Sequence, residues 1–170
     1  MELHLDPPRG IVSAGSAIPL GAAESAAVRA ASRYGPTTVA PAGTINIAGT
    51  LFPTPTKITT TGPGFELVLI LDDAVSVTAI EVWRPRDPRT DITVRYDGLD
   101  VFRTPAAQLL ELIRARGHRV ETEDEGVGAW APDLALGFSR VAAHEVPRGA
   151  DGEPLFFESV LVAAAGYYGD

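Results

Sequence analysis

A helix signal at residues 101–117 decides the fold class, and it reads VFRTPAAQLLELIRARG. Its apolar residues recur at the i, i+3, i+4, i+7 spacing of one helix face. They are Ala106, Leu109, Leu110 and Ile113. Thr104 suits the N-cap and Pro105 the first helical position, while Gly117 can adopt the left-handed conformation that ends a helix. The pattern predicts an amphipathic helix that packs on a sheet.

Most other signals predict strands. A second, Ala-rich helix is predicted at 22–34, before Gly35 and Pro36. The strongest strand signal covers 65–71, followed by a turn at Asp72-Asp73 and a return strand at 75–83 with a bulge near Thr78. Further strands are predicted at 92–96, 118–123, 127–131, 134–138 and 156–163. Residues 1–20 contain many turn residues, which predict a loop with one short strand.

Runs of strands broken by two helices predict an α+β fold. Each half has a helix closed by glycine, an extended stretch and apolar antiparallel strands. We therefore expect an internal repeat of two similar helix-plus-antiparallel-sheet units packed as one globular body. The charged connection at 84–89 separates a first half, 1–89, from a second, 90–170.

Residues 36–64 contain five prolines and nine threonines. This composition is compatible with an extended edge, a surface loop or a linker, and it includes a weak strand signal at 44–52.

Composition excludes several classes of protein. The net charge of −8 and the pI near 4.8 disfavour nucleic acid and anionic membranes, which would repel the chain. The absence of cysteine excludes disulfide scaffolds, zinc-thiolate sites and thiol catalysis. The sequence has neither a signal-peptide pattern nor an apolar run of about 18 residues, so we expect a cytoplasmic protein.

Catalytic motifs are also missing from the sequence. His4, His118 and His144 have no metal-ligand spacing, and neither a GxSxG elbow nor a phosphate-binding P-loop occurs. Asp72 and Asp73 are typical of a turn between apolar strands. We therefore predict no catalytic, cofactor-binding or metal-binding residue. A non-enzymatic role is favoured, and the question of an enzyme stays open.

Three groups of residues are candidates for contact with a partner. The first is the acidic tip of a predicted hairpin, the second an aromatic and basic group near the boundary between the halves, and the third an aromatic pair near the end of the sequence. In that order they are Glu121, Glu123, Asp124 and Glu125; Trp83, Arg84 and Arg86; and Tyr167 and Tyr168. Acidic groups favour a basic partner, and aromatic and arginine side chains are common in binding hot spots. A solvated tip and ordinary packing are the alternatives.

Residues 65–170 resemble a family of small bacterial cytoplasmic proteins of uncharacterised function. The resemblance rests on DDAVSVTAIEVWRP, DITVRYDGLDVF, TPAAQLLELI, DLALGFSRV and FESVLVAAAGYY. Some members lie beside toxin genes, as immunity proteins do. The layout is also similar to the tandem units of β-lactamase-inhibitor proteins, whose signal peptides and disulfides are absent here. Neither resemblance implies a catalytic residue.

The resemblance and the acidic charge together imply a non-enzymatic protein-binding module of immunity or inhibitor type, with another protein of basic charge as its partner. Two alternatives stay open. One is a self-assembling structural protein that uses its edge strands and residues 36–64. The other is a small-molecule-binding protein with a pocket between helix and sheet. The sequence does not fix the oligomeric state.

Overall fold

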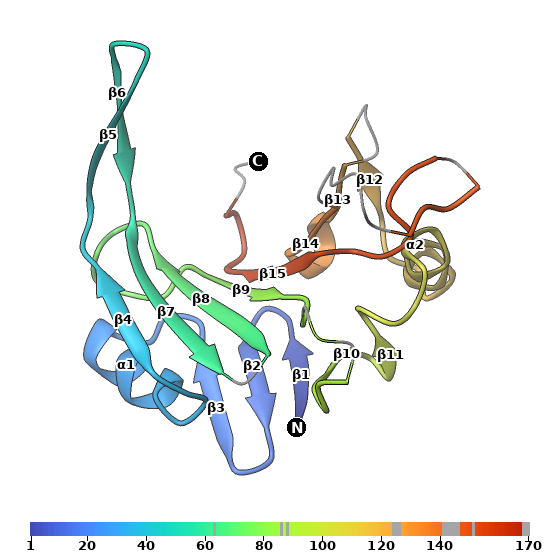
Figure 1. Ribbon diagram of the computed structural model, residues 1–170, viewed down its shortest axis with the longest axis horizontal. Helices are drawn as coiled ribbons and strands as arrows, with labels where there is room; N and C mark the ends of the chain where they lie inside the picture. Colours follow the sequence, from blue (N-terminus) through green and yellow to red (C-terminus); the bar gives the residue numbers. More distant parts are fainter. Residues whose placement is uncertain are drawn as a thin grey trace.

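The computed structural model describes residues 1–62, 64–85, 87, 89–123, 127–140, 147–150 and 152–167. These residues form two α-helices, one 3-10 turn (η1, Pro132–Leu134) and strands in three sheets (Figure 1). Most strand pairs are antiparallel. The α+β class predicted from the sequence is confirmed.

Eight strands form the large sheet, in which all neighbours are antiparallel. In spatial order they are β12 (Glu121–Thr122), β13 (Gly128–Ala131), β14 (Leu136–Ser139), β15 (Ser159–Ala163), β9 (Ala79–Trp83), β8 (Phe65–Leu71), β7 (Thr56–Gly62) and β4 (Thr37–Ala40). Strands far apart in the sequence meet at its centre, where β15 lies between β14 and β9.

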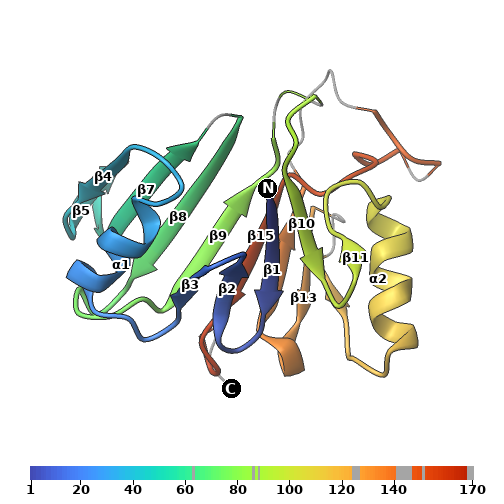
Figure 2. The same cartoon turned by 90° about the horizontal axis from the view of Figure 1, so that it is seen from below.

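Five strands form the small sheet, which lies across one face of the large sheet (Figures 1 and 2). In spatial order they are β11 (Leu99–Asp100), β10 (Thr93–Tyr96), β1 (Glu2–Asp6), β2 (Gly10–Ser13) and β3 (Ser16–Pro19). Only β1 and β10 are parallel among these pairs. The loop predicted for residues 1–20 is wrong, because their turn residues occupy two short connections between three strands.

The main core fills the space between the two sheets and the helices. The inner face of the large sheet, which we define as the face toward the small sheet, contributes Leu69, Ile80 and Val160, all fully buried. Helix α1 (Glu24–Ala31) buries Ala27 and Ala31. It is shorter than the predicted helix at 22–34, because the chain continues as a turn from residue 32.

Helix α2 (Ala106–Ala115) buries the face that the sequence predicts. Its buried residues are Ala106, Leu109, Leu110 and Ile113. The predicted start is wrong by one residue: Pro105 is the N-cap, and the Thr104 hydroxyl makes no capping bond. The chain before the helix is held instead by Asp100, whose carboxylate accepts the amides of Phe102 and Arg103. Gly117 has a φ of +89°, as predicted for the residue after the helix.

The connection between β8 and β9 is longer than predicted. Residues 72–78 lie outside both strands, and Val77 instead exchanges backbone hydrogen bonds with Gly21 and Ala22, just before α1. The change of parity in the sequence near Thr78 therefore marks the end of a loop, and the predicted bulge is wrong.

Strands from both halves of the chain mix in the two larger sheets. β1 pairs with β10, and β9 pairs with β15. The strands that the structure describes therefore show no division into two repeated units.

The third sheet has two strands, β5 (Gly43–Ile47) and β6 (Thr50–Thr54), which form a hairpin that projects from the body (Figure 1). It extends the β4–β7 pair beyond the large sheet. Pro41 and Pro55 interrupt the ladder at the junction because proline has no amide hydrogen. Residues 37–62 are thus one long interrupted hairpin. The single weak strand predicted at 44–52 is wrong, because Ala48 and Gly49 form a turn there that separates β5 from β6. Neither α-helix is long and apolar enough to cross a membrane, as judged over the described residues.

Candidate protein-binding face

The large sheet has a second face, directed away from the small sheet, which we call the outer face. Side chains alternate between the faces along each strand. On β9, Ile80 and Val82 are in the main core, so Ala79, Glu81 and Trp83 belong to the outer face. The strand register continues this row from Glu81 to Leu161 on β15. The five-stranded sheet and α1 lie on the opposite side (Figures 1 and 2).

A small apolar cluster occupies this outer face, separate from the main core. Three buried alanines form its base, and four partly buried larger side chains surround them. They are Ala79, Ala135 and Ala163, with Ile70, Trp130, Leu161 and Tyr167 around them. Such a cluster on the uncovered side of a sheet resembles the apolar centre of a protein interface more than it does a solvated face.

The indole of Trp130 lies close to a glycine on the neighbouring strand. A Cβ atom added to Gly137 would lie 3.3 Å from Cε3 of Trp130 and 3.5 Å from Cβ of Leu161. Trp130 and Gly137 are direct register partners. A side chain at 137 would therefore press against the indole, which would have to move by a few tenths of an ångström. Glu123 lies over Gly128 in a similar way, with its carboxylate where a Cβ would stand.

A hollow of about 530 Å³ opens on this face. Its lining combines the apolar cluster with carboxylates: Trp130, Leu161 and Tyr167 lie beside Glu81, Glu121 and Glu123. Glu121 is paired with Arg119 at 3.2 Å. In the described part of the chain, no cation lies within ion-pair distance of Glu81 or Glu123.

A second hollow, of about 540 Å³, adjoins Trp83 at the end of β9. Glu66, the register partner of Trp83 on β8, also lines it. Arg84 lies at its edge, with its guanidinium 4.7 Å from the centre of the Phe156 ring. This arginine therefore makes an intramolecular cation–π contact.

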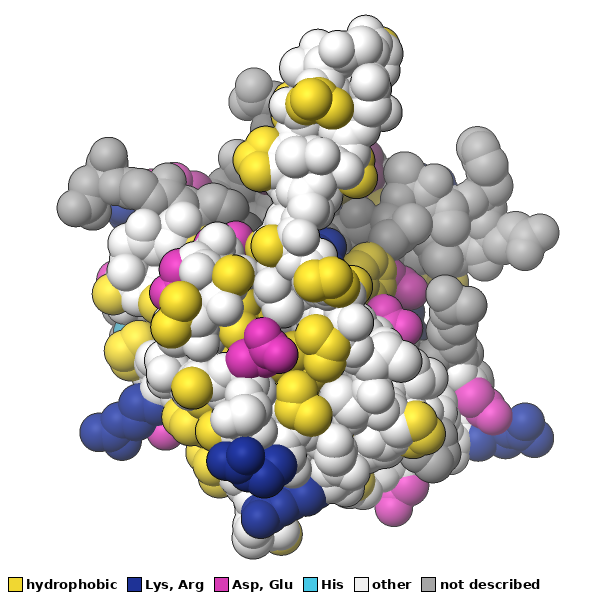
Figure 3. All heavy atoms as spheres, turned by 90° about the vertical axis from the view of Figure 1, so that its left-hand side faces the viewer, with side chains coloured by type: hydrophobic (Ala, Val, Ile, Leu, Met, Phe, Trp, Pro, Cys, Tyr) yellow, Lys and Arg dark blue, Asp and Glu magenta, His cyan; other side chains and the backbone are white. Residues whose placement is uncertain are grey.

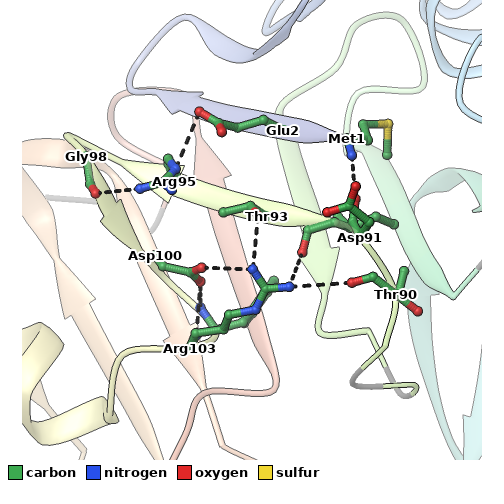
Figure 4. Close-up of polar contacts among 11 residues, drawn as sticks. Met1, Glu2, Thr90, Asp91, Thr93, Arg95, Gly98, Asp100 and Arg103 are labelled. Atoms are coloured by element: carbon green, nitrogen blue, oxygen red, sulfur yellow. Dashed lines mark hydrogen bonds and ion pairs between the residues drawn. The ribbon is translucent and has the colours of Figure 1, made fainter.

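The other arginines of this region stabilise the small sheet (Figure 4). Arg95 donates to the Gly98 carbonyl at 3.0 Å and pairs with Glu2 at 3.4 Å. Arg103 donates to Thr93 at 3.1 Å and pairs with Asp100 at 3.5 Å. Because these guanidinium groups already have partners in the fold, they do not form an anion-binding cluster with Arg84.

His118, between α2 and β12, lies in a hydrogen-bonded chain. Its Nδ1 is 2.7 Å from Asp133 Oδ2, and its Nε2 is 3.3 Å from the Tyr96 hydroxyl. Tyr96 is buried, and desolvation followed by the charge of Asp97 raises the pKa of its hydroxyl. A raised pKa disfavours the phenolate, and the hydrogen-bonded chain connects the segment after α2 to β10.

Over the described residues, no group of three or more His, Asp or Glu side chains is arranged to hold a metal ion. No family model, no curated protein and no solved structure matches this chain. The assignment of the site therefore rests on its geometry.

The structure places four of the residues predicted from the sequence on one face of the large sheet, in two separate hollows. Trp83, Glu121, Glu123 and Tyr167 all belong to or line the outer face. Arg84 lies beside it, in contact with Phe156. Arg86, Asp124, Glu125 and Tyr168, like His144, lie outside the described residues.

Sequence reasoning missed Glu81, Trp130 and Leu161. Each lies in a predicted strand at a position that alternates with buried residues, and this alternation was the available signal.

Proposed function

We propose that this protein is a non-enzymatic protein-binding module that binds a basic protein on its outer face, as an immunity or inhibitor protein does. One observation carries the proposal: Glu81 is a half-buried carboxylate near the centre of the face with no cationic partner among the described residues. Its register neighbours, Leu161 and Val68, are apolar. A cation from outside would complete this site.

The energetics favour a cation that arrives with apolar groups around it. Charge-assisted hydrogen bonds are stronger than neutral ones, and they gain further where water is excluded. A lysine or arginine on Glu81, with an apolar side chain of the same partner against Trp130 and Tyr167, would exclude water from the carboxylate. Glu121 and Glu123 at the rim would attract such a partner and speed its association.

The proposal is tested by a comparison of matched variants. Wild-type protein, Glu81→Lys, Trp130→Ala and the control Glu24→Lys are immobilised and incubated with proteins encoded beside this gene. Glu24 is exposed in the first turn of α1, on the opposite side of the molecule, so its variant has the same change in charge away from the face. Circular dichroism checks that each variant is folded.

We expect a partner that wild type and Glu24→Lys retain and that both outer-face variants lose. In titration calorimetry with that purified partner, Glu81→Lys should weaken binding by at least about thirtyfold, equivalent to roughly 2 kcal/mol. Equal loss with Glu24→Lys would indicate a general effect of net charge. That result, or unchanged binding by Glu81→Lys, would contradict the proposal.

A further inference from the structure

The hairpin of β5 and β6, residues 43–54, projects away from the body on the outer-face side of the large sheet (Figure 1), and we call it the arm. Hydrophobic side chains lie along it (Figure 3). Four large ones are well exposed: Ile45 at 47%, Ile47 at 56%, Leu51 at 66% and Phe52 at 45%. A hairpin of two strands is marginally stable alone in water. Because its large apolar side chains are exposed and two strands alone are marginally stable, we expect the arm to be covered or extended by further strands.

Charge separates the arm from the rest of the chain. The chain has a net charge of −8, yet residues 43–54 contain no charged residue. Two copies of the chain repel each other over most of their surface. Contact through the arms places the least charge between the two copies. A basic foreign partner, in contrast, finds no carboxylate on the arm to bind.

The two edges of the arm differ in their ability to pair with another strand. Ala48 and Gly49 form a two-residue turn with φ values of +50° and +89°. In a hairpin with such a turn, the flanking pair, here Ile47–Thr50, is hydrogen-bonded. Along the hairpin, non-hydrogen-bonded and hydrogen-bonded pairs then alternate. The pairs Asn46–Leu51 and Thr44–Pro53 thus direct their backbone groups outward. On β6 one outward nitrogen belongs to Pro53 and has no hydrogen, which protects that edge. On β5 both outward amides are present.

We propose that the arm binds a second copy of this chain by antiparallel pairing of β5 with its own counterpart. Antiparallel pairing of a strand with itself has two-fold symmetry, which is the symmetry of a closed dimer. With the axis at Ile45, the outward groups of Thr44 meet those of Asn46 in the second copy. The result is a four-stranded sheet in the order β6-β5-β5-β6. This function is additional to binding on the outer face.

The same register joins the apolar side chains of the two arms. Ile45 lies directly opposite its own copy in a non-hydrogen-bonded pair, where side chains approach most closely. Ile47 and Phe52 share a face with Ile45, because the register pairs Ile45 with Phe52 and alternation places Ile47 beside them. The two arms together form one apolar strip from two smaller ones.

The self-opposed position gives a sharp experiment. Sedimentation velocity is measured for the full chain from about 10 µM to about 1 mM, with Ile45→Lys, Ile45→Glu, an equimolar mixture of these two, and Leu51→Lys. In the four-stranded arrangement the two copies of residue 45 meet, whereas the two copies of residue 51 lie on the outer strands. Leu51→Lys is therefore a control with the same charge on the same arm. Both side chains are exposed, so the body should fold in every variant, which circular dichroism checks.

We expect the wild-type mass to rise with concentration from 17.9 kDa to twice that value. Ile45→Lys and Ile45→Glu should each raise the dimer Kd at least tenfold, because like charges meet across the axis. The mixture should restore dimers, and Leu51→Lys should behave as wild type. A wild-type chain that stays monomeric at every concentration overturns the proposal. A Leu51→Lys variant as defective as Ile45→Lys, or a mixture without dimers, overturns it equally.

Discussion

Truncation of one leucine on α2 measures how much the main core depends on this helix. The Leu109 side chain is fully buried in the main core. Leu109→Ala removes its outer carbons and leaves a cavity, which costs about 2–5 kcal/mol in well-packed cores. The neighbouring Gln108 is exposed on the same helix, and Gln108→Ala should change the free energy of unfolding by less than about 0.5 kcal/mol. If Leu109→Ala lowers the free energy of unfolding by about 3 kcal/mol, the Tm should fall by about 6–12 °C for a chain of this size.

Urea unfolding followed by circular dichroism, together with thermal scans, measures both variants. The m-value should stay unchanged, because the same surface is exposed on unfolding. A Leu109→Ala variant as stable as wild type would show that α2 is not part of the cooperative core. Equal losses in Leu109→Ala and Gln108→Ala would show that the assigned buried face is wrong.

Two further perturbations test local geometry. Gly10 has a φ of +129°, and a Cβ there would lie 2.2 Å from the Ile18 carbonyl oxygen, whereas Gly15 has a φ of +79° and open space around it. Gly10→Ala should therefore lower the free energy of unfolding, measured with urea, by several kcal/mol, and Gly15→Ala should lower it by about 1 kcal/mol. Equal losses in the two variants would contradict the close packing at Gly10. The Asp73 carboxylate accepts backbone amides of the β8–β9 connection, first that of Ser76, and these bonds lower its pKa. The stabilisation by the Asp73 carboxylate is present above the unfolded pKa of about 3.9 and is lost as the pH falls through the lower folded pKa. The difference in free energy of unfolding between wild type and Asp73→Ala should therefore shrink between pH 7 and pH 2. A constant difference would count against this role.

Local periodicity was sufficient to predict both helices and most of the strands after residue 64, but it missed most of the strands in residues 1–62. The spacing on α2 identifies all four of its buried side chains, and the alternation in 65–71 identifies β8. The cap of α2 was mispredicted for a tertiary reason: the Ala106 amide donates to the carbonyl of Leu155. That acceptor comes from a segment about fifty residues later, so no local rule could supply it.

The order of strands was beyond local reasoning, and the outer face depends on that order. Alternation shows that Glu81 and Leu161 lie on one side of their strands. It does not show that β15 enters between β14 and β9 and places residue 161 beside residue 81. For this reason the sequence indicated Trp83, Glu121 and Tyr167 as separate candidates, and only the fold shows that they share one face of the large sheet.

The two proposed surfaces can act together because they lie at different ends of the large sheet. Trp130 is on β13, six strand intervals from β4, which is roughly 30 Å at about 4.8 Å per interval. We therefore expect pairing of the arms to leave the hollow around Trp130 accessible, so that a dimer presents two outer faces. A partner with two copies of its basic epitope would then bind with avidity. Ile45→Lys should consequently weaken binding to a bivalent partner and leave the affinity for a monovalent one unchanged, which separates the role of the arm from that of the outer face.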